Sequence, residues 1–135
     1  MNKAIEFLKQ SEVQYFATVG LDGKPKVRPF QFMFEDGDKL YFCTSPNKDV
    51  YKELQKQPCI EICCSGSNLS WLRMAAQVVF TNDTSIKARI LEISPLVKSI
   101  YKTPENPGLI AFYLEKVTGI INNLNGVPAE TFQFE

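Results

Sequence analysis

The sequence predicts a mainly β (α+β) domain, a small antiparallel barrel of six or seven strands with short helices at its periphery. Strand-like segments follow one another directly near the start of the chain. The helical segments do not alternate regularly with the strands, which excludes a doubly wound parallel sheet. No repeat, low-complexity tract or linker divides the chain, so we expect a single domain, residues 1–135.

An amphipathic helix is expected at the start of the chain, followed by three strands. In residues 2–11, apolar side chains recur at helical spacing and charged side chains face the other way. The strands, expected to form a meander, cover residues 13–20, 27–34 and 39–44. Alternation along the second strand puts four side chains on one face: Arg28, Phe30, Phe32 and Phe34. Asp36 and Gly37 form the turn into the third strand.

The segment after the third strand combines the features of a phosphate site. Ser45 and Pro46 are predicted to be the N-cap and first residue of a helix, because proline loses no hydrogen bond there. A helix N-terminus leaves backbone N–H groups unpaired and carries partial positive charge. Thr44, Lys48 and Arg28 would then surround a bound phosphate. The alternative is an ordinary hairpin followed by a surface helix with a solvated lysine, and both interpretations stay open on residue types alone.

The second half of the chain is expected to hold four strands. They cover residues 59–65, 71–81, 109–122 and about 130–134. Asn125 and Gly126 lie in the turn region of the last pair.

A helical segment separates the second and third of these strands. Asn82 or Asp83 can cap it, and Pro95 interrupts it, so we expect two short helices or one bent helix, with Ser94 as a new N-cap. Its apolar stripe is expected to belong to the core and consists of Ile86, Ile90, Ile93, Val97 and Ile100.

Composition limits the possible functions. The 15 basic and 15 acidic residues give zero net charge, which argues against nucleic acid as a partner and favours self-association. No apolar run reaches membrane-spanning length and the N-terminus lacks a signal-peptide core, so a cytoplasmic location is expected. Without histidine, the familiar catalytic triads are absent, and no Gly-rich nucleotide-binding motif occurs.

The four cysteines are expected to be reduced and packed rather than bound to metal. Cys59, Cys63 and Cys64 fall in one predicted strand, which sends the last two to opposite faces. No C-x-x-C pair exists, and no histidine can complete a tetrahedral set.

Four segments in order carry a family resemblance: YFATVGLDGKPKVRPF, DKLYFCTSPNKDVYKELQKQP, WLRMAAQVVF and PGLIAFYLEKVTGIINNLNG. With the short helix before them they cover nearly the whole chain. This pattern resembles the pyridoxamine 5'-phosphate oxidase-like, FMN-binding split-barrel family, in particular its nitroimidazole-resistance and general stress branch. The resemblance implies a split β-barrel that forms a homodimer, with FMN at each of two equivalent interface sites.

The resemblance also implies which residues would bind the cofactor. Arg28 would meet its phosphate side, with Pro29 and Phe30 along the flavin. Cys43 and Thr44 would border the ring and the ribityl chain. The phosphate site would be completed by Ser45, Asn47 and Lys48, while Trp71 and Arg73 would come from the partner subunit.

This chain departs from the family pattern at three points. The family often has glycine three residues after an arginine in this strand, where this chain has Ala76 after Arg73. The C-terminal Trp and Arg segment that recognises pyridoxamine phosphate in the true oxidases has no counterpart, which argues against vitamin B6 oxidation. A histidine used in the nitroimidazole-resistance branch is also absent.

Two classes of function follow from the resemblance. The first is an FMN-dependent oxidoreductase that oxidises or reduces a small molecule through flavin N5. The second is a non-catalytic carrier or sensor that binds a flavin, a deazaflavin or haem, because the cofactor would supply the redox chemistry in either case. If the protein is an enzyme, we expect it to act without a strong protein acid or base. Apolar neighbours should raise the pKa of Cys43 and leave its thiol unreactive.

Overall fold

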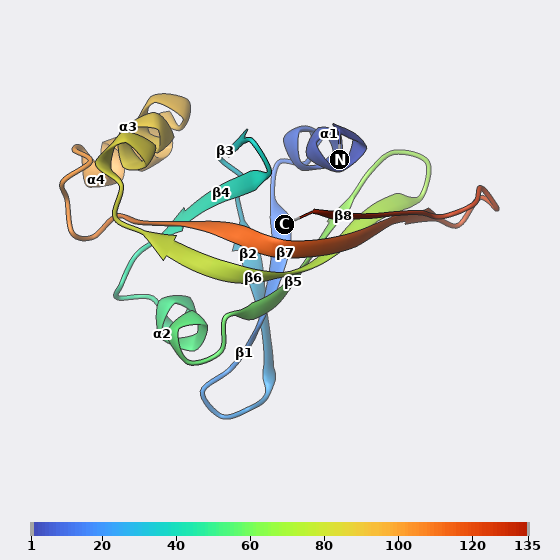
Figure 1. Cartoon of the computed structure of the whole chain (residues 1–135), viewed down its shortest axis with the longest axis horizontal. Coiled ribbons are helices and arrows are strands. Elements are labelled where there is room, and N and C mark those ends of the chain that lie inside the picture. The colour runs from blue at the N-terminus through green and yellow to red at the C-terminus, as the bar shows by residue number, and fades with distance from the viewer. Residues whose placement is uncertain (1, 135) are drawn as a thin grey trace.

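The computed structural model describes residues 2–134, which form eight strands and four short helices (Figure 1). The helices are α1 (Asn2–Gln10), α2 (Asp49–Lys56), α3 (Thr84–Ile93) and α4 (Pro95–Tyr101). The strands are β1 (Gln14–Val19), β2 (Pro25–Phe30), β3 (Phe34–Asp36), β4 (Lys39–Thr44), β5 (Cys59–Ser65), β6 (Ser70–Thr81), β7 (Ile110–Asn123) and β8 (Glu130–Phe134). Their order in the sheet is β2-β1-β5-β6-β7-β4-β3, with β8 beside β7.

All paired strands are antiparallel. The sheet is not closed, and the helices lie at its periphery (Figure 1). The predicted mainly β split barrel with short peripheral helices is therefore confirmed.

The main core is a cluster of phenylalanine rings from strands that are far apart in sequence. Phe16 of β1, Phe42 of β4 and Phe112 of β7 are fully buried. The Phe42 and Phe112 rings stack with their centroids 5.8 Å apart. The ring centroid of Phe30 on β2 lies 4.6 Å from that of Phe16 and 6.4 Å from that of Phe42. Aromatic rings attract one another at these distances. These contacts bring the end of β2 next to β4, although the two strands do not pair.

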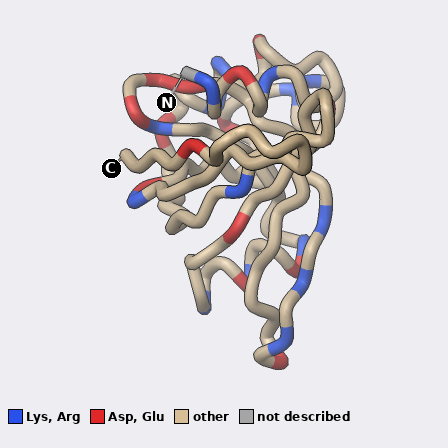
Figure 2. The backbone as a smooth tube through the Cα atoms, turned by 90° about the vertical axis from the view of Figure 1, so that its right-hand side faces the viewer, with Lys and Arg blue, Asp and Glu red and all other residues tan. Residues whose placement is uncertain are grey.

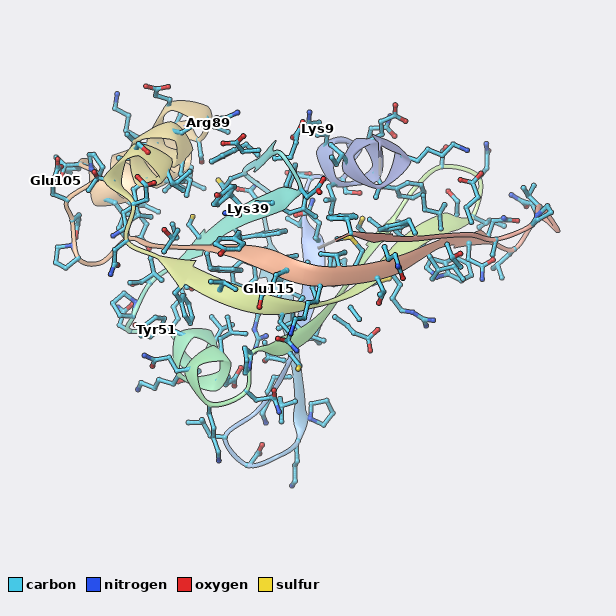
Figure 3. The ribbon with its side chains drawn as sticks, in the orientation of Figure 1. Lys9, Lys39, Tyr51, Arg89, Glu105 and Glu115 are labelled. Atoms are coloured by element: carbon cyan, nitrogen blue, oxygen red, sulfur yellow. The ribbon has the colours of Figure 1, made fainter. Side chains whose placement is uncertain are left out.

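A smaller core attaches α3 and α4 to one end of the sheet (Figure 1). Ile90 of α3 is fully buried against Phe34 of β3 and Tyr41 of β4. The guanidinium of Arg89, labelled in Figure 3, lies 4.1 Å from the centre of the Phe34 ring, a cation–π contact. The helix pair is therefore fixed to β3 and β4, beside the part of the sheet that contains the candidate site.

The single strand predicted over residues 27–34 is wrong: it divides into β2 and β3, which makes eight strands instead of six or seven. β2 pairs with β1, whereas β3 pairs with β4, so the predicted meander is also wrong. The buried side chain of Gln14 explains the division, since its Oε1 accepts a hydrogen bond of 2.6 Å from the backbone N–H of Phe32. The next N–H, of Met33, already donates to the carbonyl of Tyr41 on β4.

The start of the second helix also differs from the prediction. α2 begins at Asp49, with Lys48 as its N-cap, so Ser45 and Pro46 are not the cap and first helical residue. The Ser45 hydroxyl donates to Oδ1 of Asn47, 2.5 Å away, and therefore does not cap the helix. The intervening residues form a turn closed by a hydrogen bond from the Lys48 N–H to the Ser45 carbonyl.

The division of the helical segment at Pro95 is confirmed. Asp83 caps α3 through a bond from the Ser85 N–H, and Ser94 caps α4 through a bond from the Val97 N–H. The single core stripe is wrong in part, because Ile90 and Val97 are buried whereas Ile93 is 44% and Ile100 58% exposed. The break at Pro95 turns the second helix, so one stripe cannot continue across both.

The predicted strands of the second half are confirmed to within one residue. As alternation along β5 requires, Cys63 is exposed and Cys64 is buried. Cys59 is exposed as well, so the prediction that the cysteines are packed is wrong for Cys59 and Cys63, which lie on the outer face of β5. Within residues 2–134 no three His, Cys, Asp or Glu side chains gather as a metal site would require.

Charged residues of both signs are interspersed along the backbone (Figure 2). The charge at any one site is therefore decided by local ion pairs. No described helix has the length and apolar character needed to span a membrane.

Candidate functional site

A cavity of about 290 Å³ opens between β2, β4, the start of α2 and α4. It brings together six of the ten predicted site residues: Arg28, Pro29, Phe30, Cys43, Thr44 and Lys48. Much of the remaining lining is apolar and includes four residues of α4: Leu96, Val97, Ile100 and Tyr101. Mainly apolar cavities with a few convergent polar groups are typical of small-molecule sites.

Thr44, at the end of β4, has an unsatisfied hydroxyl. The residue is 2% exposed, and its Oγ1 has no hydrogen-bond partner among the described residues. A buried polar group without a partner costs roughly 1–3 kcal/mol. Because Thr44 lines the cavity, a ligand that hydrogen-bonds to the hydroxyl would remove this cost.

Lys48 brings a positive charge to the same side of the cavity. It is exposed, and its side chain forms no ion pair with any described residue. It is also the N-cap of α2, and no side chain caps the helix there. The free N–H groups of the first turn add partial positive charge, which Asp49 offsets in part. The side chain of Lys48 and the N-terminus of α2 are therefore suited to binding an anionic group.

Arg28, on the β2 side of the cavity, is held by other protein groups. Its Nη2 donates to Oε1 of Glu53 at 2.7 Å. Its Nη1 donates to Oγ1 of Thr18 at 2.8 Å and to the carbonyl of Phe16 at 3.1 Å. The Thr18 hydroxyl in turn donates to the same Glu53 oxygen at 2.6 Å. Three of the five guanidinium N–H donors are therefore used within the protein.

Cys43 lines the cavity beside Thr44 but is not poised to react. Burial raises the pKa of its thiol to about 11, and the charge of Lys48 opposes the shift without cancelling it. The thiolate is the reactive form of cysteine, so this thiol stays protonated and unreactive near neutral pH. The predicted effect of the apolar surroundings on Cys43 is confirmed.

The remaining predicted residues lie outside the lining of this cavity. Ser45 and Asn47 form the turn beside Lys48 and are bonded to each other. Trp71 and Arg73 lie near the other end of the sheet, because Trp71 pairs with Asn122 of β7 whereas Thr44 pairs with Ile110. Twelve residues of strand correspond to roughly 40 Å at about 3.3 Å per residue. Within one chain, therefore, neither residue reaches the cavity.

Ala76, the residue that replaces the family glycine, has its methyl group in the main core. It is 6% exposed and packs with the buried residues of β5 and β6. It does not line the cavity, so the substitution leaves this site unchanged.

Sequence reasoning missed two parts of the site. Glu53 shares the buried face of α2 with Val50 and Leu54, and a carboxylate at an apolar position of a helix was the available signal for a buried ion pair. Val97 and Ile100 of α4 were assigned to the core, and Leu96 was not assigned a role. Only the turn of the helix at Pro95 shows that Leu96 and Ile100 face the cavity.

The fold and the cavity define a split-barrel protein with a candidate small-molecule site. The sequence model described as pyridoxamine 5'-phosphate oxidase matches residues 2–118. The chain belongs to this family. No curated protein matches the sequence.

Several solved structures share the fold. A nimC/nimA family protein from Clostridium acetobutylicum is 31% identical, with a TM-score of 0.89 over 99% of this chain and 92% of that one. A haem-binding protein from Mycobacterium smegmatis is 14% identical, with a TM-score of 0.71 over 97% of this chain and 56% of that one. An F420 reductase is 19% identical, with a TM-score of 0.62 over 81% of this chain and 89% of that one. The last two show similarity of fold alone.

The residues of the cavity fit the flavin that the family implies. The unsatisfied Thr44 hydroxyl and the unpaired Lys48 suit a phosphate group. Pro29, Phe30 and the apolar side chains of α4 suit an aromatic ring system.

Proposed function

We propose that the protein binds FMN and acts as an oxidoreductase on a small molecule. The observation that supports this most is the unsatisfied hydroxyl of Thr44, which lines a cavity beside an unpaired lysine. Neither group has a partner among residues 2–134, and a phosphate would provide one. Family membership supports a flavin as the bearer of that phosphate.

Each part of the cavity would have a separate role. Lys48 and Thr44 would hold the phosphate, with the turn at Ser45 and Asn47 placing the lysine. Pro29 and Phe30 would lie against the ring. Bound FMN supplies one- and two-electron redox chemistry to a substrate held against it.

The cavity offers no carboxylate or imidazole for proton transfer, because its lining residues within the described chain include no Asp, Glu or His. Cys43 stays protonated. Protons would then come from water or from the substrate. The substrates that suit this site best are therefore flat electron acceptors that need no protein acid, such as nitroaromatics or quinones. Their rate of reduction should then show no bell-shaped pH profile from a protein group.

A homodimer would complete the site. Apolar side chains stay exposed on the outer side of β1 and β2, including Tyr15, Val19 and Val27. A second copy could cover them and bring its own Trp71 and Arg73 to the cavity, which one chain cannot do. Light scattering is expected to show a dimer, and a flavin-saturated monomer would contradict this arrangement.

The test of the phosphate site is a comparison of FMN with riboflavin. Lys48→Ala should weaken FMN binding about tenfold to a hundredfold, because a charge-assisted hydrogen bond contributes roughly 1.5–3 kcal/mol. Riboflavin affinity should barely change. Lys52→Ala is a matched control, since Lys52 is an exposed lysine of the same helix outside the cavity lining. Equal losses for FMN and riboflavin would overturn this assignment of Lys48.

The second candidate function is a carrier or sensor that binds haem or a deazaflavin, and the similarity of fold to a haem-binding protein and an F420 reductase supports it. Denaturing the purified protein and identifying what it releases separates the candidates. FMN would support the oxidoreductase. Haem, or failure of every electron donor to reduce a bound flavin, would support the carrier or sensor.

A further inference from the structure

Glu53 is a buried carboxylate that does not line the cavity yet contacts a residue that does. The residue is 5% exposed. Its Oε1 lies 2.7 Å from Nη2 of Arg28, which lines the cavity, and accepts a second bond from Thr18. Both donors are themselves held by the protein, so the carboxylate has a fixed position behind the guanidinium.

This contact changes the charge that a ligand meets. Of the described residues that line the cavity, Arg28 and Lys48 carry positive charge. The Glu53 carboxylate compensates Arg28, whereas Lys48 is paired with no described residue. The lining residues together with Glu53 therefore carry a net charge close to one positive unit instead of two.

We propose that Glu53 determines how strongly this cavity attracts a phosphate group, and so how strongly it prefers FMN to riboflavin. The inference rests on the proposed function for the identity of the flavin, although the charge argument applies to any phosphate. Two N–H groups of Arg28 have no hydrogen-bond partner among the described residues, and the fixed carboxylate behind the guanidinium weakens its attraction for a dianion. Glu53 thus acts through Arg28 as a residue that sets specificity.

The variant Glu53→Gln keeps the shape of the side chain and an oxygen acceptor while removing its charge. The dissociation constants for FMN and riboflavin are measured for wild type and variant. The ratio of riboflavin to FMN constants is expected to rise about tenfold, which corresponds to about 1.4 kcal/mol. A purely structural role would change both constants alike. An unchanged or lower ratio would overturn the proposal.

The control is Glu6→Gln on α1. This removes the same charge from an exposed position on a helix that lies on the opposite side of the sheet from α2 (Figure 1). Charges that far apart are screened by salt. The control is expected to keep the wild-type ratio, and a rise equal to that of Glu53→Gln would overturn the local charge effect.

Inorganic phosphate gives a second measurement that needs no flavin. At saturating phosphate, the melting temperature of Glu53→Gln should rise by about 5 °C more than that of wild type for a tenfold gain in affinity. Chloride at equal ionic strength is the reference. If the variant is unfolded in buffer, phosphate is expected to restore its far-UV circular dichroism, and failure to do so would overturn the proposal.

The two measurements separate this inference from the proposed function. A wild type that binds neither flavin would contradict the proposed function, and the phosphate shift alone would then decide the inference. A wild type that prefers FMN, with a ratio that Glu53→Gln leaves unchanged, would contradict the inference alone.

Discussion

The two sides of the cavity differ in how their polar groups are satisfied. On one side, Arg28 of β2, Thr18 of β1 and Glu53 of α2 bond to one another at 2.6–2.8 Å. On the other side, at the end of β4 and the turn before α2, the Thr44 hydroxyl has no partner among the described residues and Lys48 forms no ion pair with any of them. Buried polar groups in folded proteins are normally paired, so an unpaired one needs an explanation. The paired groups therefore mainly stabilise the fold, and the side with the unpaired groups is the stronger candidate for ligand binding.

The largest effect expected from this difference is on stability. Arg28→Ala would leave the Glu53 carboxylate buried without its cation, a change that costs about 3–5 kcal/mol. Lys48→Ala removes an exposed, unpaired lysine and should change the unfolding free energy by less than about 0.5 kcal/mol. Urea unfolding of both variants measures the contrast. Equal destabilisation would show that the two sides do not differ in this way.

A second expected effect concerns the buried thiol on the ligand side. The pKa of Cys43 rises from 9.0 to about 11 on folding, so the folded state holds a proton that the unfolded state has lost between these values. The contribution of Cys43 to the unfolding free energy should be constant below pH 9 and fall by about 2–3 kcal/mol as the pH rises to 11, at about 1.4 kcal/mol per pKa unit. Cys43→Ala should remove this part of the decline. Parallel pH profiles for the two proteins would contradict the buried thiol.

The fold was largely predictable because its signals are local. Alternation in β5 and β6, the caps at Asp83 and Ser94 and the turn at Gly37 each specify structure from a few neighbouring residues. The division of the strand at residues 31–33 was not predictable, because it depends on a hydrogen bond from Phe32 to Gln14, eighteen positions away.

The candidate site was less predictable than the fold, because it depends more on contacts between residues that are far apart in sequence. The resemblance indicated residues that do line one cavity, such as Thr44 and Lys48. The sequence could not show that Arg28 is already paired, because its partner Glu53 is 25 positions away and on another element. It also could not show that one chain keeps Trp71 roughly 40 Å from Thr44 along the sheet, at about 3.3 Å per residue. Contacts across the fold, unlike strands and caps, leave little trace in local sequence.

The smallest expected effect gives the most direct test of the comparison, because the same change, threonine to valine, can be made on both sides of the cavity. Thr44→Val removes an unpaired hydroxyl, so it should stabilise the ligand-free protein by about 1 kcal/mol, the lower end of the cost of burying such a group. Thr18→Val removes a hydroxyl bonded to Arg28 and Glu53 and should destabilise it by about 1–2 kcal/mol.

Ligand binding should follow the opposite order. Thr44→Val should weaken FMN by about tenfold, because the ligand loses a hydrogen bond worth about 1 kcal/mol or more. Thr18→Val leaves the charges of Arg28 and Glu53 in place and should change FMN affinity less. Thermal unfolding without ligand gives the stability of each variant, and fluorescence titration gives its affinity for FMN. A destabilised Thr44→Val with unchanged FMN affinity would mean that the hydroxyl serves the fold, and the distinction between the two sides would not hold.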